Sequence, residues 1–188
     1  MKTSVYIATT LDGFIASPSG SIDFLNEYQT SASPEEDGDM GFSSFLSSVD
    51  LLIMGRKTWD QVVEFGEEMW PYGQKDVWIW SRNAERVVIP ECRRGQACAY
   101  SLTSTKMMEL AKEKGYNHIY VDGGTTIQEF QRGGFIDEYI LSRVPLILGG
   151  GIPLFENQNE AGAMKKMEHL ETKSFSNGIV QSHYQVKR

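Results

Sequence analysis

The feature that most constrains the fold is a short apolar run that occurs three times and each time ends in small or basic residues. The runs cover residues 51–54, 77–80 and 119–121 and are rich in β-branched, aromatic or other large apolar side chains. Their length and composition are typical of strands buried on both faces of a sheet. Segments with helical periodicity separate them, and this alternation favours a mostly parallel sheet covered on both faces by helices. We therefore predict an α/β fold with three layers, αβα.

Strands without intervening helices are expected at both ends of the chain. Residues 4–10 predict a first strand, which the turn pair Asp12-Gly13 ends because glycine accepts the positive φ of a tight turn. Residues 138–148 and 178–188 predict two long strands, and we expect antiparallel strands at one edge of the sheet. The remaining expectations are a surface loop over residues 17–41, helices over 40–48, from Thr58 to Gly66, after residues 101–102 and over 127–131, and a short strand at 87–89.

Length and composition bound the class of protein. The chain has 188 residues with 40% hydrophobic content, so we expect a single domain, residues 1–188, that folds without metal or disulfide staples. The net charge is −7 and the basic residues are scattered, which disfavours nucleic acid and membrane partners. Cys92 and Cys98 lack the spacing of a zinc site, and two reduced thiols are typical of a cytoplasmic protein. We expect a cytoplasmic location and no metal.

Three segments at the strand ends carry the residue types that bind phosphate. They are Gly55 to Thr58 (GRKT), Ser81 to Asn83 (SRN) and Gly123 to Thr126 (GGTT). Parallel strands place their carboxyl ends along one crevice, so the segments could converge on one ligand. Glycine lets the backbone approach closely, helix N-terminal amides donate to oxyanions, and arginine binds them in bidentate fashion. The alternative is that each glycine is a helix-entry turn and each arginine a solvated charge.

The order of these motifs resembles a known fold family. Neither the G-x-G-x-x-G fingerprint nor a P-loop is present. The segments "ATTLDGFIA", "IMGRKTW", "PYGQKDVWIWSR" and "YVDGGTTIQEF" resemble the dihydrofolate reductase fold up to about residue 145. The segment "VPLILGGGIPLF", residues 144–155, is similar to the reductase domain of bacterial riboflavin biosynthesis, which shares that fold. The resemblance implies a dihydrofolate reductase-like αβα domain and an NADPH-dependent oxidoreductase.

By this resemblance, each of the three phosphate segments would bind a different part of NADPH. Residues 56–58 would hold cofactor phosphates, Ser81 and Arg82 the adenosine 2′-phosphate, and residues 123–125 the pyrophosphate, while Ala8 and Ile15 would flank the nicotinamide. The cofactor-binding residues expected in all are Ala8, Ile15, Gly55, Arg56, Lys57, Thr58, Ser81, Arg82, Gly123, Gly124, Thr125 and Thr126.

Two aspartates are candidates for the catalytic acid, because hydride reduction of a C=N or C=O bond also needs a proton. Asp39 stands sixteen residues before Gly55, which matches the spacing of the pterin-binding acid in dihydrofolate reductases; the alternative is an ordinary N-cap. Asp122 lies between Val121 and the glycine pair, where riboflavin reductases carry an acidic residue. The alternative for Asp122 is a charge satisfied by backbone amides. The sequence leaves the choice between the two open.

The substrate is expected to be a small heterocycle. Folate reductases use an arginine after the glycine of a Pro-x-Gly turn, whereas this chain has Gln74 after Gly73, which disfavours folate. The resemblance suggests 5-amino-6-(5-phosphoribosylamino)uracil, from riboflavin biosynthesis, or a pterin-like compound. The aromatic residues Phe14, Trp59, Trp70 and Tyr72 could line a pocket for a flat ring, and the alternative, above all for Trp59, is a position in the core.

Other functions and the oligomeric state stay open. The alternatives are a non-catalytic protein that binds NADP(H) or another nucleotide, an authentic dihydrofolate reductase, and an enzyme that uses Arg56 and Arg82 on a sugar phosphate. The apolar run at residues 139–148, placed at a sheet edge, predicts a homodimer, because an exposed apolar edge strand needs a cover.

Overall fold

The computed structural model describes residues 1–30, 37–155 and 164–187. The chain groups into two compact units, which we describe separately. Unit 1 comprises Met1–Ser4 and Phe45–Phe135, and unit 2 comprises Val5–Ser44 and Ile136–Arg188. Strand β1 (Lys2–Thr9) contributes residues to both units. Within the described residues, no helix is long and apolar enough to cross a membrane.

Unit 1 is built on a parallel sheet. Its strand order is β5-β4-β3-β6-β1, and every neighbouring pair is parallel. The four apolar residues of β3 that precede Gly55 are all buried, as are the three central residues of β4 and of β6. These runs are continuously apolar because both faces of the sheet are covered. The strands are β3 (Leu51–Gly55), β4 (Asp76–Trp80), β5 (Ala97–Tyr100) and β6 (His118–Asp122).

Helices cover both faces of this sheet. Phe45 of α2 packs edge-on against Tyr120 of β6, with ring centroids 5.1 Å apart, and Phe130 of α5 packs edge-on against Trp80 of β4 at 6.2 Å. Tyr120 pairs with Leu52 and Trp80 with Gly55, which are three residues apart on β3. Side chains alternate along a strand, so Tyr120 and Trp80 point to opposite faces of the sheet. The predicted three-layer arrangement is therefore confirmed for unit 1. Its helices are α2 (Phe42–Ser48, shared with unit 2), α3 (Arg56–Glu64), α4 (Ser104–Glu113) and α5 (Gly124–Arg132).

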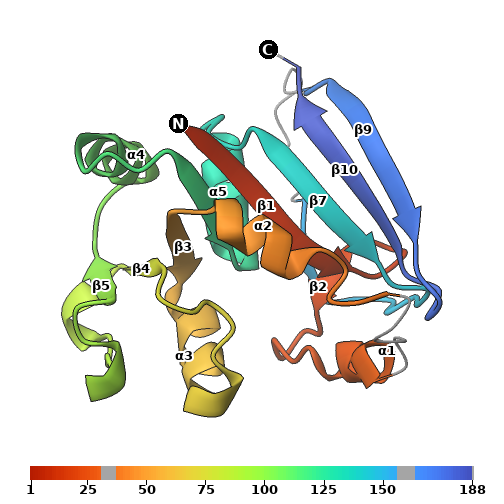
Figure 1. Ribbon diagram of the computed structural model, residues 1–188, viewed down its shortest axis with the longest axis horizontal. Coiled ribbons are helices and arrows are strands. Elements are labelled where there is room, and N and C mark those ends of the chain that lie inside the picture. The colour runs from red at the N-terminus through yellow and green to blue at the C-terminus, as the bar shows by residue number, and fades with distance from the viewer. Residues whose placement is uncertain (31–36, 156–163, 188) are drawn as a thin grey trace. The chain divides into compact units, whose positions relative to one another are not determined.

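Two strand-to-helix turns of unit 1 interlock through glycine and threonine. Helix α3 begins directly after the last residue of β3, and a single residue, Gly123, separates the end of β6 from the start of α5. Figure 1 shows both helices following their strands. A Cβ atom on Gly55 would lie 2.8 Å from Oγ1 of Thr126, and one on Gly123 would lie 2.3 Å from Oγ1 of Thr58. Each glycine thus makes room for the threonine of the other helix. The two helix starts can approach this closely only because their N-cap residues, Gly55 and Gly123, carry no side chain.

Unit 2 carries the antiparallel strands. Its strand order is β1-β7-β10-β9, in which β7 and β10, and β10 and β9, pair antiparallel (Figure 1). Because β1 pairs in both units, the strands form one mixed order of eight, β5-β4-β3-β6-β1-β7-β10-β9. The remaining elements are a two-stranded sheet of β2 (Phe14–Ala16) and β8 (Ile152–Pro153), helices η1 (Asp23–Leu25) and α1 (Asn26–Thr30), and strands β7 (Glu138–Arg143), β9 (Met167–Ser174) and β10 (Val180–Val186).

Several predicted elements differ from the structure. Helix α3 begins at Arg56 rather than Thr58, and α5 begins at Gly124 rather than residue 127. The predicted strand at residues 87–89 is wrong, because this stretch is irregular and follows a short 3-10 turn, Ala84–Arg86. The predicted strand 138–148 ends at Arg143, since Pro145 cannot donate to a strand ladder. Residues 31–36 of the predicted loop lie outside the described residues.

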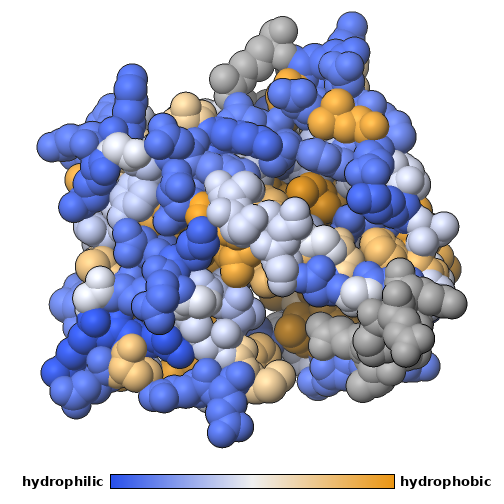
Figure 2. Space-filling model, in the orientation of Figure 1, coloured by the Kyte–Doolittle hydropathy of each residue, from blue (hydrophilic) through white to orange (hydrophobic). Residues whose placement is uncertain are grey.

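The edge of the unit 2 sheet is β9 and not the apolar run at residues 139–148. Strand β7 lies between β1 and β10, so the predicted edge position of this run is wrong. Strand β9 is exposed at every residue after Met167 and carries Glu168, Glu171 and Lys173, charges that oppose pairing with another chain. Figure 2 shows a largely hydrophilic face with hydrophobic side chains in small separate patches. The homodimer stays a prediction, and β7 does not support it because β7 is not an edge strand.

The interlocked turns predict unequal effects of two glycine substitutions. Gly123 and Gly115 both have positive φ, +87° and +83°, but only Gly123 faces a neighbour within 4 Å. Gly115→Ala should lower the free energy of unfolding by about 1–2 kcal/mol, the cost of a left-handed side chain. Gly123→Ala should lower it by about 1–3 kcal/mol more, because the methyl group meets Thr58. Urea unfolding measures both, and adding Thr58→Ala to Gly123→Ala should recover part of the excess. Equal losses at the two glycines would contradict the interlock.

Candidate active site

The three predicted phosphate segments begin at one edge of the unit 1 sheet. In the strand registers Met54 lies beside both Ile79 and Asp122, and Gly55 lies beside Trp80. The carboxyl ends of β3, β4 and β6 are therefore level with one another. The segments that follow them, residues 55–58, 81–83 and 123–126, leave this edge together, as expected for a crevice at the carboxyl ends of parallel strands.

The helices that start at this edge from β3 and β6 have no capping side chain. The N-cap residues of α3 and α5 are Gly55 and Gly123, and neither helix has an acidic residue in its first turn. By contrast, Thr103 caps α4, because its side chain accepts a hydrogen bond from the N–H group of Lys106. The first N–H groups of an α-helix lack intrahelical partners and carry the positive end of the helix dipole. Two such ends beside each other favour a bound anion.

Cationic side chains extend from the same edge. Arg56, Lys57 and Arg82 are exposed, and Arg56 forms an ion pair with Asp60 one turn along α3. Among the residues that the structure describes, no carboxylate pairs with Lys57 or Arg82. Arg56 and Lys57 occupy the end of the helix dipole that repels cations, which is unfavourable unless an anion lies nearby. The charge pattern therefore agrees with the uncapped helix starts.

The hydroxyl residues of the segments differ in how accessible they are. Thr125 is exposed and Thr58 is half-buried, whereas Thr126 is 1% exposed. Ser81 is half-buried, and its Oγ accepts a hydrogen bond from the N–H group of Asn83 at 3.2 Å. Thr125 is thus the hydroxyl of this set most open to a ligand, while Thr126 packs against the start of α3.

Asp122 is held at the junction of β6 and α5. The N–H group of Gly123 donates to its Oδ1 at 2.8 Å, and the hydroxyl of Tyr72 donates to its Oδ2 at 3.4 Å. Part of the residue remains open to solvent, yet its carboxyl lies deep enough that desolvation by burial raises its pKa. Hydrogen bonds from Gly123, Tyr72 and Tyr120 oppose this rise. A buried carboxyl with a raised pKa can hold a proton for transfer.

Asp39 has the opposite environment. It is exposed, and its carboxylate accepts hydrogen bonds from the N–H groups of Gly41 at 2.9 Å and Ser43 at 2.6 Å. Hydrogen bonds from Ser43 are the main cause that lowers its pKa. Asp39 therefore carries a charge at neutral pH and caps the start of α2. Ala8 and Ile15, predicted beside the nicotinamide, belong like Asp39 to unit 2, half-buried on β1 and buried on β2.

A cluster of aromatic side chains supports Tyr72. Trp70 packs edge-on against Tyr72, with ring centroids 5.2 Å apart, and against Trp59 at 6.0 Å. Trp59 is fully buried and Tyr72 is 4% exposed, so both are core residues rather than the walls of an open pocket. The sequence reasoning missed the contact between Tyr72 and Asp122. No signal in the sequence links the two, since they are fifty residues apart in the chain.

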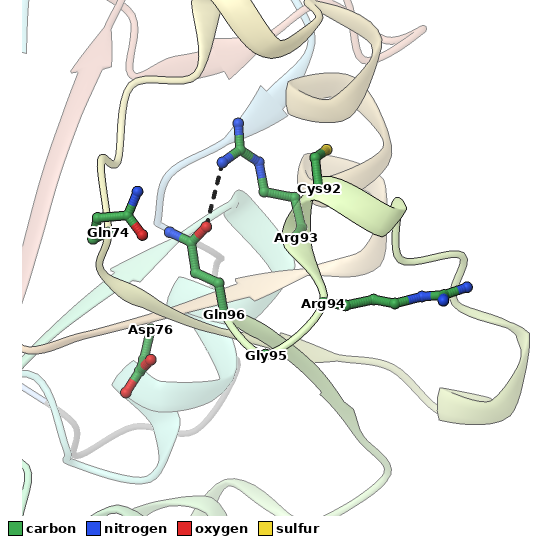
Figure 3. A pocket seen from close by; sticks show the side chains of 7 residues that line it. All are labelled: Gln74, Asp76, Cys92, Arg93, Arg94, Gly95 and Gln96. Carbon is green, nitrogen blue, oxygen red and sulfur yellow. Dashed lines mark hydrogen bonds between the residues drawn. The ribbon is translucent and has the colours of Figure 1, made fainter.

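The surface hollow in Figure 3 lies at the other end of the strands. It is lined by Gln74, Asp76, Cys92, Arg93, Arg94, Gly95 and Gln96. Asp76 is the first residue of β4, and Gln96 directly precedes β5. Gln96 spans the hollow by donating from Nε2 to the carbonyl oxygens of Gly73 at 2.7 Å and Lys75 at 2.8 Å. The hollow is therefore separate from the edge where the phosphate segments meet.

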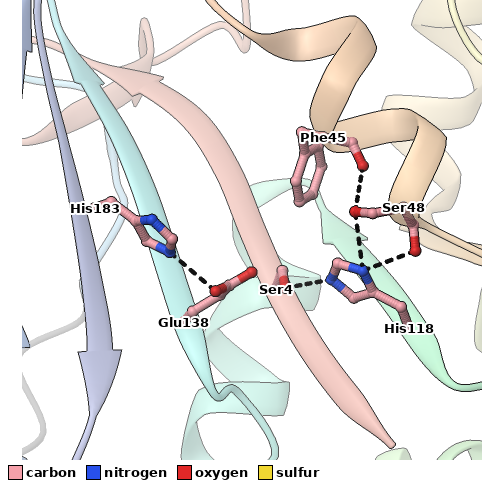
Figure 4. Close-up of polar contacts among 6 residues, drawn as sticks. All are labelled: Ser4, Phe45, Ser48, His118, Glu138 and His183. Atoms are coloured by element: carbon pink, nitrogen blue, oxygen red, sulfur yellow. Dashed lines mark hydrogen bonds and ion pairs between the residues drawn. The ribbon is translucent and has the colours of Figure 1, made fainter. Parts of the chain in front are cut away.

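The histidines serve local hydrogen bonds. In unit 1, His118 hydrogen-bonds Ser4 at 2.6 Å and the backbone oxygen of Ser48 at 2.9 Å (Figure 4). In unit 2, His183 of β10 pairs with Glu138 of β7 at 2.9 Å (Figure 4). Within the described parts of the chain, no group of three or more His, Cys, Asp or Glu residues could hold a metal ion.

Comparison with known proteins places this arrangement in a family. The family model for the RibD C-terminal domain matches residues 2–181. The uncharacterized protein YwjB of Bacillus subtilis (strain 168) is 35% identical over 184 residues, which cover 97% of each chain. The crystal structure of a candidate riboflavin biosynthesis protein from Shewanella sp. PV-4 matches with a TM-score of 0.85 at 32% identity, over 100% of each chain.

A more distant comparison concerns the fold alone. Dihydrofolate reductase from Enterococcus faecalis matches with a TM-score of 0.60 at 10% identity, over 100% of this chain and 97% of that chain. The predicted dihydrofolate reductase-like α/β fold is therefore confirmed.

The two aspartates predict opposite dependences of stability on pH. The pKa of Asp122 is higher in the folded than in the unfolded chain, so its contribution to the free energy of unfolding falls as pH rises through the folded pKa. Asp122→Asn removes this fall, and the stability of the variant relative to the wild type should grow with pH. The pKa of Asp39 is lowered, so its contribution is lost as pH falls, and Asp39→Asn should weaken the protein most at neutral pH. Urea unfolding between about pH 4 and pH 8 tests this. Parallel curves for the wild type and Asp122→Asn would contradict the assignment.

Proposed function

Because the chain belongs to the RibD C-terminal domain family, we propose that it is an NADPH-dependent reductase that transfers hydride to a small heterocyclic substrate. One observation carries the proposal: two uncapped helix starts lie side by side next to a carboxyl with a raised pKa. The first feature suits a dinucleotide phosphate, and the second suits the proton that accompanies a hydride.

The residues present fit the phosphates of a dinucleotide. We call the space between the starts of α3 and α5 the cradle. It requires that residues 55 and 123 lack a Cβ, and its hydrogen-bond donors are backbone N–H groups and the hydroxyls of Thr58 and Thr125. We assign the pyrophosphate to Gly123, Gly124 and Thr125, and further phosphate contacts to residues 55–58. Thr126 supports the cradle from its buried position.

The 2′-phosphate of NADPH is assigned to Ser81 and Arg82. Both follow β4 at the carboxyl edge, and Arg82 is exposed without an ionic partner among the described residues. Its backbone oxygen accepts a hydrogen bond from the Ser101 hydroxyl at 3.0 Å, which anchors the turn while the side chain stays available. Ala8 and Ile15 are assigned to the nicotinamide by family resemblance.

The chain's own chemical step is proton delivery. Bound NADPH would supply the hydride to an electrophilic carbon of the substrate. Asp122 would hold a proton on Oδ2, since the N–H group of Gly123 occupies Oδ1 and can only donate. The Gly123 N–H group then stabilises the carboxylate that remains after transfer. Asp39 is ionised and engaged with the start of α2, so we assign the proton to Asp122.

The substrate is proposed as a heterocycle such as 5-amino-6-(5-phosphoribosylamino)uracil or a pterin-like compound. The chain has Gln74 where folate reductases use an arginine, which disfavours folate as the substrate. Mixing the protein with NADPH and each oxidised heterocycle, and following the absorbance of the reduced nicotinamide, tests the proposal. Oxidation with dihydrofolate alone would favour a dihydrofolate reductase, and tight binding without any oxidation would favour a binding protein.

The cofactor assignment predicts a change of nucleotide preference. Arg82→Ala should reduce the preference for NADPH over NADH by about 10- to 150-fold, because a hydrogen bond to a charged group contributes about 1.5–3 kcal/mol. Arg94→Ala is the matched control, since Arg94 is also exposed but lies at the hollow at the other end of the strands. Calorimetric titration with both nucleotides measures the preference. An unchanged preference in Arg82→Ala, or an equal loss in Arg94→Ala, would contradict it.

A further inference from the structure

We propose that Tyr72 is a positioning residue that fixes Asp122 Oδ2, the oxygen from which the proton leaves. The inference rests on the proposed function and adds a residue that the family resemblance did not assign. It depends on three features of unit 1: how the two carboxyl oxygens of Asp122 are bonded, how the Tyr72 ring is held, and which groups face the carboxyl.

The two oxygens of Asp122 have different partners. Oδ1 accepts from the N–H group of Gly123 at 2.8 Å, and Oδ2 faces the hydroxyl of Tyr72 at 3.4 Å. A backbone N–H group can only donate, whereas a hydroxyl both donates and accepts. The hydroxyl can therefore accept from protonated Oδ2 and donate to it after the proton has left. Catalytic hydrogen bonds are often long without substrate and tighten when it binds.

The ring of Tyr72 cannot easily reorient. Trp70 contacts it edge-on at an interplanar angle of 89°. Trp70 in turn contacts buried Trp59 and the guanidinium of Arg93, which lies 4.0 Å from the ring centroid of Trp70. The backbone oxygen of Tyr72 accepts from the N–H group of Lys75 at 3.1 Å. The cluster thus aims one hydroxyl at one carboxyl oxygen.

The groups that face Asp122 set its proton affinity. They are the hydroxyls of Tyr72 and Tyr120 and the N–H group of Gly123, and no charged side chain of unit 1 is among the causes that shift its pKa. Burial raises the pKa of Tyr72 well above its usual value, so this hydroxyl stays protonated. Tyr72 is only 4% exposed and has little surface with which to meet a substrate. It therefore acts through Asp122 and is not itself the acid.

The step balances without an additional reactant. Bound NADPH would supply the hydride to the substrate carbon and would itself be oxidised, and the substrate nitrogen or oxygen would gain a proton from Asp122 Oδ2. The O–H bond of Asp122 breaks, a new bond to that proton forms on the substrate, and the Tyr72 hydroxyl turns from accepting to donating. The proton returns to Asp122 from solvent water after the product has left. Tyr72 is neither oxidised nor deprotonated.

Tyr72→Phe tests the inference, with Tyr116→Phe as its matched control. Tyr116 also donates its hydroxyl to an aspartate, Asp76 Oδ2 at 2.5 Å, but at the amino end of β4. Without the Tyr72 donor, the Asp122 carboxylate is less stable, so its titration midpoint should rise by about one pH unit. Carboxyl ¹³C NMR of aspartate-labelled protein measures the midpoint, and Asp122→Asn identifies the resonance. Tyr116→Phe should leave the midpoint unchanged.

Kinetics test whether the contact acts in the reaction. The rate needs protonated Asp122, so kcat falls as pH rises, and in Tyr72→Phe this fall should move to higher pH together with the NMR midpoint. At low pH kcat should be about 10-fold below the wild-type value, with KM for NADPH unchanged. An unmoved midpoint, or a moved midpoint with a wild-type rate profile, overturns the inference. If wild-type protein oxidises NADPH with none of the heterocycles, the proposed function has failed instead, and the NMR result still decides whether Tyr72 fixes Asp122.

Discussion

The site depends on how two neighbouring strand-to-helix turns pack against each other: each turn has a glycine where the threonine of the other turn fits. Gly55 leaves room for Thr126, and Gly123 leaves room for Thr58. These glycines are also the N-cap residues of α3 and α5, and without a side chain they cannot cap the helices. The glycines that allow close packing therefore also leave helix N–H groups free. The two positive helix ends and the cations Lys57 and Arg82 meet at one sheet edge. A bound anion would relieve a repulsion that the fold itself creates.

Asp39 and Asp122 have the same side chain, but their environments give them different protonation behaviour. Asp39 is exposed and accepts hydrogen bonds from the start of α2, which lowers its pKa and keeps it charged. Asp122 is withdrawn at the end of a buried strand, and desolvation raises its pKa despite three hydrogen-bond donors. Pairs of titratable groups whose environments move their pKa values apart are a general guide to acid and base roles. Asp122 is on this basis the stronger candidate for proton delivery.

The sequence predicted the fold best where the apolar pattern was continuous. The strands at residues 51–54, 77–80 and 119–121 are all present, since burial on both faces leaves a clear apolar signature. It failed for β9, which is polar because it is an exposed edge, and at residues 87–89, where β-branched side chains occupy an irregular stretch. The turn segments could be located from glycine and basic residues. The contact of Tyr72 with Asp122 could not, because it depends on tertiary packing between distant segments.

The most direct test of the central claim is a crystal structure of the protein with NADP⁺. We predict that the pyrophosphate lies between the starts of α3 and α5, within hydrogen-bond distance of the amides of Gly124 and Thr125, and that the 2′-phosphate contacts Arg82. Phosphates bound instead at the hollow lined by Arg93 and Arg94, or elsewhere on the surface, would contradict the claim that the interlocked turns form the cofactor site.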